Sequence, residues 1–428
     1  MAKDIFYTGI DVGTSKVSTM VARVSGEGDL QVLGMGVVPS KGMEKGVVVN
    51  VQEAGEAVKA SVDEARRYIG KGLSPAHVTI SGSHISCSST RGILPGQGGP
   101  TVLTRDEVRA LIRSAYPNPS SGMELLHIIP RDFVIDGLKG VRNPVGLTTD
   151  DARVETTVVM GSSAAIRNVQ RAVEKSGVEV ASLVLSPLAT ADAVLTEDEK
   201  ELGVVLVDIG AGTTDIAIFK SGRLQHCTCI PVGGNQISRD LSVALNIPIY
   251  YAEEAKLRWG CALPEMVDAS EEVLIPTFQG GARKTVNRSE LCEPIYERVL
   301  ETLRLIILKL REAGLERLPA GGLVLTGGTV EMPGIEELAK RAVHSAIRIA
   351  QPRQLPGLPD DFLTPAFGAS VGILIWSARH YGEKTTYENP VSIFKASKRL
   401  LSQISTSTGT RWKQTRQRVT QELKKIYA

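Results

Sequence analysis

The chain is poor in aromatic residues, which make up 4% of its 428 residues, so we expect its cores to be built mainly from aliphatic side chains. Its five cysteines are an odd number without framework spacing, which favours reduced thiols over disulfides. No apolar run approaches the roughly 20 residues of a membrane span, and we expect no secretory signal before Asp4. The composition therefore argues against a small disulfide scaffold and an integral membrane protein, and the length predicts two to four compact units.

The familiar phosphate-loop sequences are absent as well. The pattern Gly-x-x-x-x-Gly-Lys-[Ser/Thr] does not occur, and Gly210-Ala-Gly212 lacks the third glycine of a dinucleotide fingerprint and leads into a strand. The chain contains instead two similar segments, residues 9–16 and 204–215. In each, an apolar run typical of a buried strand ends in Asp and a Gly-rich turn, and a second strand follows.

Turns of this kind present backbone N–H groups and hydroxyls to a phosphate, and an Asp at the strand end can hold Mg²⁺ through water. Two of them facing each other would bind one nucleoside triphosphate, so the sequence predicts such a nucleotide and Mg²⁺ as cofactors. Asp11 and Asp208 are the expected metal-site residues. The residues expected around the phosphates and metal are Asp11, Gly13, Thr14, Ser15, Lys16, Asp208, Gly210, Gly212, Thr213 and Thr214.

A third segment, residues 322–334, is typical of a buried strand followed by a Gly-rich turn and a helix that starts at Ile335. A pair of glycines in such a turn lets the backbone approach a base or ribose closely. We therefore expect Gly327, Gly328 and Thr329 to lie beside the nucleoside.

In this order the three segments resemble the phosphate 1, phosphate 2 and adenosine motifs of the actin, Hsp70 and sugar-kinase superfamily. Residues 186–195 and 364–372 are similar to its two connecting helices. Within the superfamily, the amino-acid sequence of residues 9–16, 183–195 and 231–240 is most similar to that of the FtsA family of bacterial cell-division proteins. This resemblance spans about residues 5 to 377. It implies an α/β, actin-like (ribonuclease H-like) duplicated fold with two lobes, and it adds Gly233, Gly234, Glu253 and Lys256 to the nucleotide site.

The resemblance also implies a subdomain plan. Residues 83–160 show turn-rich stretches, a helix at Arg105–Ser114 and strands near 125–135 and 155–160, typical of a small α+β insertion. In the FtsA family this insertion is subdomain 1C, which is used in contacts between subunits. The expected divisions are 1A in residues 1–82 and 161–197, 1C in 83–160, 2A in 198–233 and 301–382, 2B in 234–300, and a linker and tail in 383–428.

The expected 2B segment contains helices at Gln236–Leu245 and about 251–260, then a basic stretch before a helix at Glu290–Leu310. For Glu253 and Lys256, an ordinary surface pair three residues apart on a helix is the alternative to a nucleotide contact. In the FtsA family, 2B receives the C-terminal peptide of FtsZ, the tubulin-like division protein. The resemblance makes Arg283, Lys284 and Arg288 candidate contacts for it, with a solvated loop as the alternative.

The C-terminal tail carries most of the positive charge. Residues 391–428 hold nine Lys and Arg against one acid, Glu422, while the whole chain has a net charge of only +2. Two helical segments with apolar stripes and basic opposite faces are expected there, suited to lie in the interface of an anionic membrane. Ordinary helix packing and a nucleic-acid arm are the alternatives, although base-stacking aromatics are lacking. The stripes are Ile393, Phe394, Leu400, Leu401 and Ile404, and Trp412, Val419, Leu423 and Ile426.

Ser186 occupies the position just before a proline where hydrolytic relatives place an acid or Gln that positions the attacking water. Because a short hydroxyl is a poor base, we expect at most slow ATP hydrolysis and assign no catalytic residue. The segment His226–Cys229 could suggest a metal site. Its two cysteines share one face of a probable strand and no second ligand pair follows, so we expect thiols without metal.

Three functions are compatible with these residues. The first is an ATP-binding, polymer-forming adaptor that ties FtsZ to the cytoplasmic face of the membrane at the septum. Its expected partners are the FtsZ peptide, further copies of itself, anionic lipid and other division proteins, but no nucleic acid. The second is a PilM-like scaffold of type IV pilus assembly, which shares the fold. The third is a sugar-kinase-type phosphotransferase, whose catalytic Asp would have to be Asp132, Asp136, Asp150 or Asp151.

Overall fold

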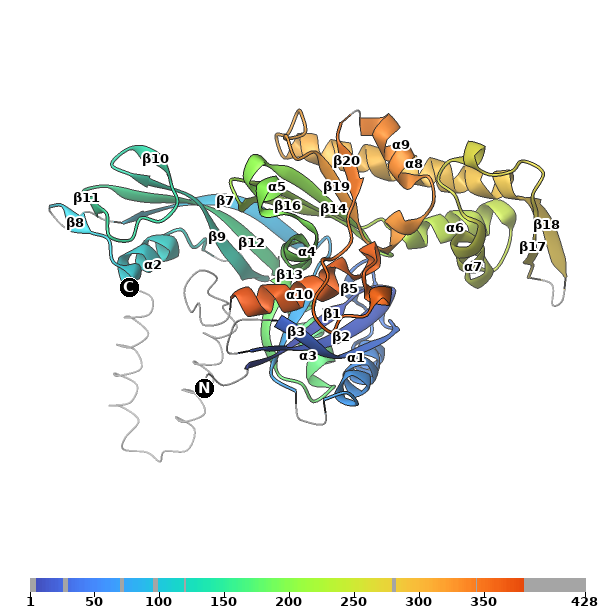
Figure 1. The fold of residues 1–428 in the computed structure, drawn as a ribbon, viewed down its shortest axis with the longest axis horizontal. Helices are drawn as coiled ribbons and strands as arrows, with labels where there is room; N and C mark the ends of the chain where they lie inside the picture. The colour runs from blue at the N-terminus through green and yellow to red at the C-terminus, as the bar shows by residue number, and fades with distance from the viewer. Residues whose placement is uncertain are drawn as a thin grey trace.

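A computed structural model describes residues 5–25, 30–69, 73–94, 99–118, 121–278, 282–343 and 345–380 (Figure 1). The tail predicted at residues 383–428, with its nine candidate membrane-binding residues, lies outside the described residues. Two five-stranded sheets form the body of the molecule. The first is ordered β13-β6-β1-β2-β3 and the second β16-β15-β14-β19-β20.

The two sheets repeat one topology. In the first, β1 is antiparallel to β2 and parallel to β6, and in the second, β14 is antiparallel to β15 and parallel to β19. Each sheet therefore has three antiparallel strands extended by two parallel ones, which confirms the predicted duplication. The strands of the first sheet are β1 Ile5–Val12, β2 Lys16–Val24, β3 Leu30–Pro39, β6 Ala76–Ile80 and β13 Val180–Leu185. Those of the second are β14 Val204–Ile209, β15 Thr214–Lys220, β16 Arg223–Ile230, β19 Leu323–Thr326 and β20 Ile347–Ile349.

Two helices join the lobes at the centre of the molecule. They are α4 (Ser186–Val194) and α10 (Gly368–Arg379), predicted as the connecting helices, and both lie between the two sheets in Figure 1. A Cβ atom on Gly372 would overlap the carbonyl oxygen of Ala189, so the helices cross too closely for any other residue there. The outer helices of the first lobe are α1 Val51–Arg66 and α3 Ser163–Glu174. The hairpin of β4 Met43–Glu44 and β5 Val47–Val48 precedes α1. The short helix α5 Glu197–Leu202 follows α4 and contacts β15 of the second lobe.

The insertion forms a separate four-stranded sheet, ordered β10-β9-β12-β7, with its own apolar core around Leu111, Ile128 and Val158. The predicted helix at Arg105–Ser114 is confirmed as α2 with the same bounds, because Thr104 and Glu107 form a reciprocal capping box at its start. The strands are β7 Ile85–Leu94, β8 Thr101–Val102, β9 Met123–Ile135, β10 Leu138–Val141, β11 Thr148–Thr149 and β12 Ala152–Ser162.

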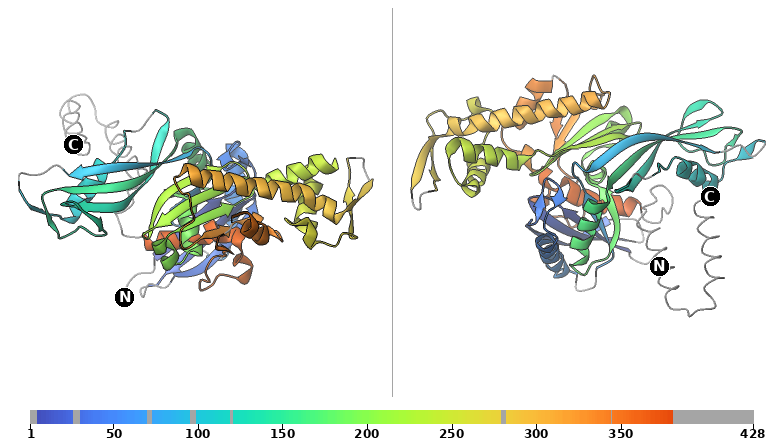
Figure 2. Two further views of the ribbon diagram at one scale, coloured as in Figure 1. Left: turned by 90° about the horizontal axis from the view of Figure 1, so that it is seen from above. Right: turned by 180° about the vertical axis from the view of Figure 1, so that it is seen from behind.

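A second extension lies at the opposite end of the molecule from the insertion (Figure 2). It comprises α6 Gly234–Leu245, α7 Ile249–Trp259, the hairpin β17 Glu272–Pro276 and β18 Arg283–Asn287, and the first half of α8 Arg288–Glu312. The predicted helices here are confirmed, each with slightly different bounds. The remaining elements are α9 Ile335–Val343 and the 3₁₀ turns η1 Pro264–Met266, η2 Gly328–Glu331, η3 Asp360–Phe362 and η4 Pro365–Phe367.

The buried His127 connects the insertion to the first lobe, and the half-buried His77 lies nearby within the sheet of that lobe. The Leu185 N–H donates a 2.9 Å hydrogen bond to His127 Nε2, and His77 Nδ1 lies 2.6 Å from Ser182 Oγ. Burial, assisted by repulsion from His380, lowers the pKa of His127 to about 3 and that of His77 to about 4. Both rings therefore stay neutral in the folded protein at pH values where they are protonated in the unfolded chain.

We expect acid to destabilise this junction. Between pH 6.5 and 4 the two rings are protonated in the unfolded chain but neutral in the folded protein. The free energy of unfolding therefore falls as the pH is lowered, by about 2 kcal/mol for each ring at pH 5. The variant His127→Gln keeps an acceptor for Leu185 but cannot be protonated. Urea unfolding at pH 7 and pH 5 should show a smaller pH-dependent loss in this variant. An unchanged loss would contradict the assignment.

Candidate functional site

The two predicted turns face each other across the junction of the lobes. In the first, the Gly13 N–H donates to the Lys16 carbonyl at 3.0 Å, and in the second the Gly210 N–H donates to the Thr213 carbonyl at 2.9 Å. The turns thus share one backbone hydrogen-bond pattern. A Cβ atom on Gly212 would lie 2.6 Å from Thr14 Oγ1, so the tips of the two turns approach closely. The backbone N–H groups of both lobes are brought to one place.

Asp11 lies at the floor of this site and is held by two hydroxyls. Thr79 Oγ1 donates to Asp11 Oδ1 at 2.6 Å, and Ser370 Oγ donates to Asp11 Oδ2 at 2.7 Å. Ser18 Oγ in turn donates to Ser370 Oγ at 2.7 Å. These donors come from β6, α10 and β2, so the carboxylate is oriented by three separate elements.

Asp208 and Asp215 bring two more carboxyl groups to the same place. Thr190 Oγ1 donates to Asp208 at 3.2 Å, and Ser81 Oγ donates to Asp215 at 2.6 Å. Burial, together with repulsion from Asp215 and Asp11, raises the pKa of Asp208 to about 7. Burial also raises the pKa of Asp215. Three acids therefore lie close together beside the two turns and repel one another.

The nearby cation, Lys16, is directed at the second connecting segment. Its Nζ donates to the Ala366 carbonyl at 2.6 Å and lies 4.6 Å from the centroid of the Phe367 ring. It lowers the pKa of Asp208, but not enough to offset burial and the two neighbouring acids. The residues present thus fit a divalent cation, because such a charge would relieve this repulsion. Within the described ranges, no group of three or more His, Cys, Asp or Glu is arranged to hold a metal directly.

The predicted nucleoside turn packs on the second phosphate turn. Thr329 Oγ1 donates to the Gly210 carbonyl at 2.8 Å, and the Gly234 N–H donates to the same oxygen at 3.0 Å. Gly327 has φ of +94°, and a Cβ atom there would lie 2.5 Å from the Ile209 carbonyl oxygen and closer still to Asp208. A Cβ atom on Gly233 would likewise lie 2.5 Å from the Gly210 carbonyl. Only glycine allows these backbones to meet.

Glu253 and Lys256 lie on α7 beside this turn. Lys256 is buried, and its Nζ donates to Glu253 Oε2 at 2.7 Å and to the Gly234 carbonyl at 3.1 Å. The pair is three residues apart, as the sequence alternative has it, but its cation lies inside the protein rather than on the surface. The two residues therefore border the region where the turns at 210–214, 233–234 and 327–329 meet.

The comparisons with known proteins agree with this arrangement. The sequence profile described as "Cell division protein FtsA" matches residues 205–372, and the profile "SHS2 domain inserted in FTSA" matches residues 82–160. The "Cell division protein FtsA" of Pseudomonas aeruginosa is 38% identical over 368 residues, which are 86% of this chain and 88% of that protein. The chain belongs to the FtsA family of cell-division proteins. Its Escherichia coli K12 relative is 34% identical over 395 residues, or 90% and 92% of the two chains.

The solved structure of a "PilM-PilN type IV pilus biogenesis complex" is similar to this chain with a TM-score of 0.61 and 15% identity, covering 87% of this chain and 98% of that one. At this identity the likeness concerns the fold alone. With the duplicated lobes and the inserted SHS2 domain, it confirms the predicted actin-like α/β fold of this FtsA-family protein. Among its described residues, no helix is long and apolar enough to cross a membrane.

The structure adds residues to the site that sequence reasoning missed. Asp215 directly follows the predicted turn and closes the acidic cluster, and its position after two threonines was the available signal. The hydroxyls that hold the acids had no local signal because they come from segments far along the chain. They are Thr79, Ser81, Thr190 and Ser370.

Proposed function

We propose that this FtsA-family protein binds Mg-ATP between its lobes, assembles head to tail on the cytoplasmic face of the membrane at the septum, and attaches FtsZ there. The observation that carries the nucleotide part is the meeting of two equivalent turns over three acids. Asp11, Asp208 and Asp215 create a concentration of negative charge that a phosphate-bound Mg²⁺ would neutralise. Bound Mg²⁺ would supply charge neutralisation for the phosphates.

The protein's own groups divide the nucleotide between them. The backbone N–H groups and hydroxyls of residues 13–15 and 210–214 would bind the phosphates, while the turn at 327–329 would border the nucleoside. Glu253 and Lys256 would lie beside the ribose and base, and Gly233 and Gly234 would form the wall between. Lys16 would take part through charge rather than through a direct contact unless its bond to Ala366 breaks.

Turnover is proposed to be slow. Ser186 is the first residue of α4, is buried, and carries no carboxylate that could orient a water molecule. The acids in the cleft are already engaged by hydroxyl donors, since Asp11 accepts two and Asp208 one. The site thus favours holding a nucleotide over hydrolysing it.

Membrane attachment rests on the tail sequence. Its nine basic residues and two apolar stripes suit the interface of an anionic leaflet, with about 1 kcal/mol from each basic residue near the surface. Head-to-tail assembly rests on shape, because the insertion and the extension with β17 and β18 lie at opposite ends of the molecule (Figures 1 and 2). Unlike ends that bind each other produce an open filament rather than a closed dimer.

The FtsZ peptide is assigned to the β17–β18 hairpin. Leu274 and Arg283 belong to one face of it because side chains alternate along a strand, and both are exposed. Lys284 is exposed on the other face and reaches the Leu245 carbonyl at 3.4 Å. Arg288 differs, since it pairs with Glu271 at 2.7 Å and donates to the Trp259 carbonyl. An apolar anchor beside a cation suits a mixed-charge peptide.

We expect the FtsZ C-terminal peptide to bind with micromolar affinity in fluorescence anisotropy. Arg283→Glu combined with Leu274→Ala should weaken binding at least about tenfold by removing the charge and the anchor. Lys139→Glu, on the exposed strand β10 of the insertion, makes the same charge change far from the hairpin and should leave the affinity unchanged. Binding of a pilus inner-membrane peptide instead of the FtsZ peptide would contradict this part of the proposal.

The acids considered for the sugar-kinase alternative lie in the insertion, where their hydrogen bonds hold local turns. Asp136 accepts hydrogen bonds from Thr149 and from the N–H groups of Asp150 and Asp151, and Asp132 accepts one from the Gly140 N–H. These contacts hold turns of the insertion and leave no such acid at the cleft between the lobes. The PilM-like alternative shares the fold, but membership of the FtsA family favours the division adaptor.

A further inference from the structure

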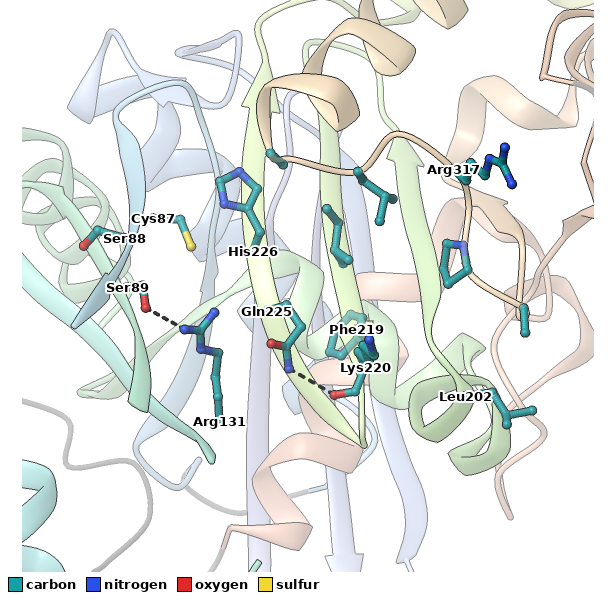
Figure 3. A pocket seen from close by; sticks show the side chains of 15 residues that line it. Cys87, Ser88, Ser89, Arg131, Leu202, Phe219, Lys220, Gln225, His226 and Arg317 are labelled. Carbon is teal, nitrogen blue, oxygen red and sulfur yellow. Dashed lines mark hydrogen bonds between the residues drawn. The ribbon is translucent and has the colours of Figure 1, made fainter. Parts of the chain in front are cut away.

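A cavity of about 610 Å³ lies where the insertion meets the second lobe, and none of the three acids Asp11, Asp208 and Asp215 lines it. Figure 3 shows it between the strand that carries Cys87 and the strand that carries His226. Its basic lining residues are Arg131, Lys220, His226 and Arg317, and none of the lining residues is an acid. Arg131 is paired with Glu155 at 3.6 Å, outside the lining. A small solute can therefore reach Cys87 through a positively charged cavity, which favours an anionic thiolate.

Cys87 and Cys227 lie on the edge strands of two different sheets. Within the described residues, β7 pairs only with β12 and β16 only with β15, so the two edges meet without a shared ladder. Cys87 packs against the apolar core cluster that contains Cys227. In Figure 3 the Cys87 sulfur points toward the strand of His226, and the next residue of that strand is Cys227. The two thiols therefore lie close together where the insertion meets the second lobe.

The environments of the two sulfurs divide their roles. The neighbouring Cys227 thiol, with a further contribution from His226, lowers the pKa of Cys87 below its usual range. The same interaction together with burial raises the pKa of Cys227 well above its usual range. Cys87 is half-buried and lines the cavity, whereas Cys227 is buried behind it. An accessible thiolate thus lies beside a protected thiol, the arrangement of a reactive cysteine with a resolving partner.

We propose that Cys87 is a peroxide-reactive thiol and that Cys227 resolves its oxidised form into a disulfide that ties the insertion to the second lobe. The Cys87 thiolate attacks one oxygen of a hydroperoxide, the O–O bond breaks, and the leaving oxygen takes up a proton. The Cys87 sulfenic acid that forms is then attacked by the Cys227 sulfur. The S–O bond breaks, the Cys227 proton leaves with the hydroxyl as water, and both sulfurs are oxidised while the peroxide is reduced.

Two other thiols, Cys261 and Cys292, serve as an internal control for the oxidation of Cys87. Cys261 and Cys292 are both buried, and burial raises the pKa of Cys292 to about 11. Neither lines the cavity. These two thiols should remain reduced under conditions that oxidise Cys87.

The test treats the full-length protein with hydrogen peroxide and maps non-reduced tryptic peptides by mass spectrometry. Residues 72–91 contain Cys87 alone, and residues 224–239 contain both Cys227 and Cys229. We expect these two peptides to become linked with loss of two hydrogens. Cys229→Ser should retain the link, whereas Cys227→Ser should lose it and instead accumulate a dimedone adduct on Cys87, the signature of an unresolved sulfenic acid.

A link that persists in Cys227→Ser would assign Cys229 as the partner and overturn the proposal. Equal oxidation of Cys261 and Cys292, or absence of both the link and the dimedone adduct, would also overturn it. Each variant is first compared with the parent by thermal unfolding, so that a loss of structure is not mistaken for a loss of the thiol. Iodoacetamide should label Cys87 at pH 7 at least about tenfold faster than Cys292 in the intact protein.

Discussion

Replacing Gly327 with aspartate is expected to weaken ATP binding at least about 100-fold, a loss of about 3 kcal/mol in calorimetric titration. Gly327 has φ of +94°, a conformation that costs free energy in any residue with a side chain. A Cβ atom there would overlap Asp208, so the new carboxylate would enter a cleft in which three acids already repel one another. Both effects close the space proposed for the nucleoside and raise the charge opposed to phosphate.

Gly99→Asp is the matched control, because it makes the same change in the insertion, outside the proposed nucleotide site. A Cβ atom on Gly99 would meet no other heavy atom within 4 Å, and its backbone has no positive φ. This variant should bind ATP within about threefold of the parent. Thermal unfolding in the absence of nucleotide should show that Gly327→Asp still folds. Undiminished binding in a folded Gly327→Asp protein would show that ATP lies elsewhere.

Deleting residues 391–428 is expected to abolish flotation with anionic vesicles. The tail holds nine basic residues, and at about 1 kcal/mol each near the surface their removal should lower partitioning more than about 100-fold. Binding by the intact chain should weaken as salt is added, because screening shortens the reach of the surface charge. FtsZ should be recruited to vesicles only by the intact chain. Equal flotation of the truncated protein would remove the tail from this role.

Single substitutions should show which tail segment attaches. Leu400→Glu and Leu423→Glu each place a charge within one apolar stripe, and only the one in the anchoring segment should detach the protein. Ser402→Glu and Gln421→Glu add the same charge about 180° around the same expected helices and are the matched controls. Detachment by the controls as strongly as by the leucine variants would indicate loss of net positive charge rather than loss of an apolar anchor.

Local sequence patterns predicted strands and turns, but not which charged side chains are free to bind a partner. The apolar runs within residues 204–219 predicted two strands and the turn between them, and these are β14 and β15. The basic stretch at 283–288 suggested three equivalent cations, but the structure separates them. Arg283 is exposed, whereas Arg288 is occupied by Glu271 and the Trp259 carbonyl, which lie 17 and 29 residues away. The number of charged residues can be counted from the sequence, but whether each one is free to contact a partner depends on the fold.

The sequence by itself determined the local elements of this protein: the paired turns after Asp11 and Asp208, the capped helix at Arg105–Ser114 and the glycines at 327 and 328. Periodicity, capping and turn residues act over a few neighbouring positions, so they can be recognised from the sequence alone. Only the tertiary structure decided that Ser370 holds Asp11 from 359 residues away, that Asp215 joins the acidic cluster, and that Cys87 meets Cys227. Such contacts arise where distant elements pack together, and no local pattern encodes which side chains will then face one another.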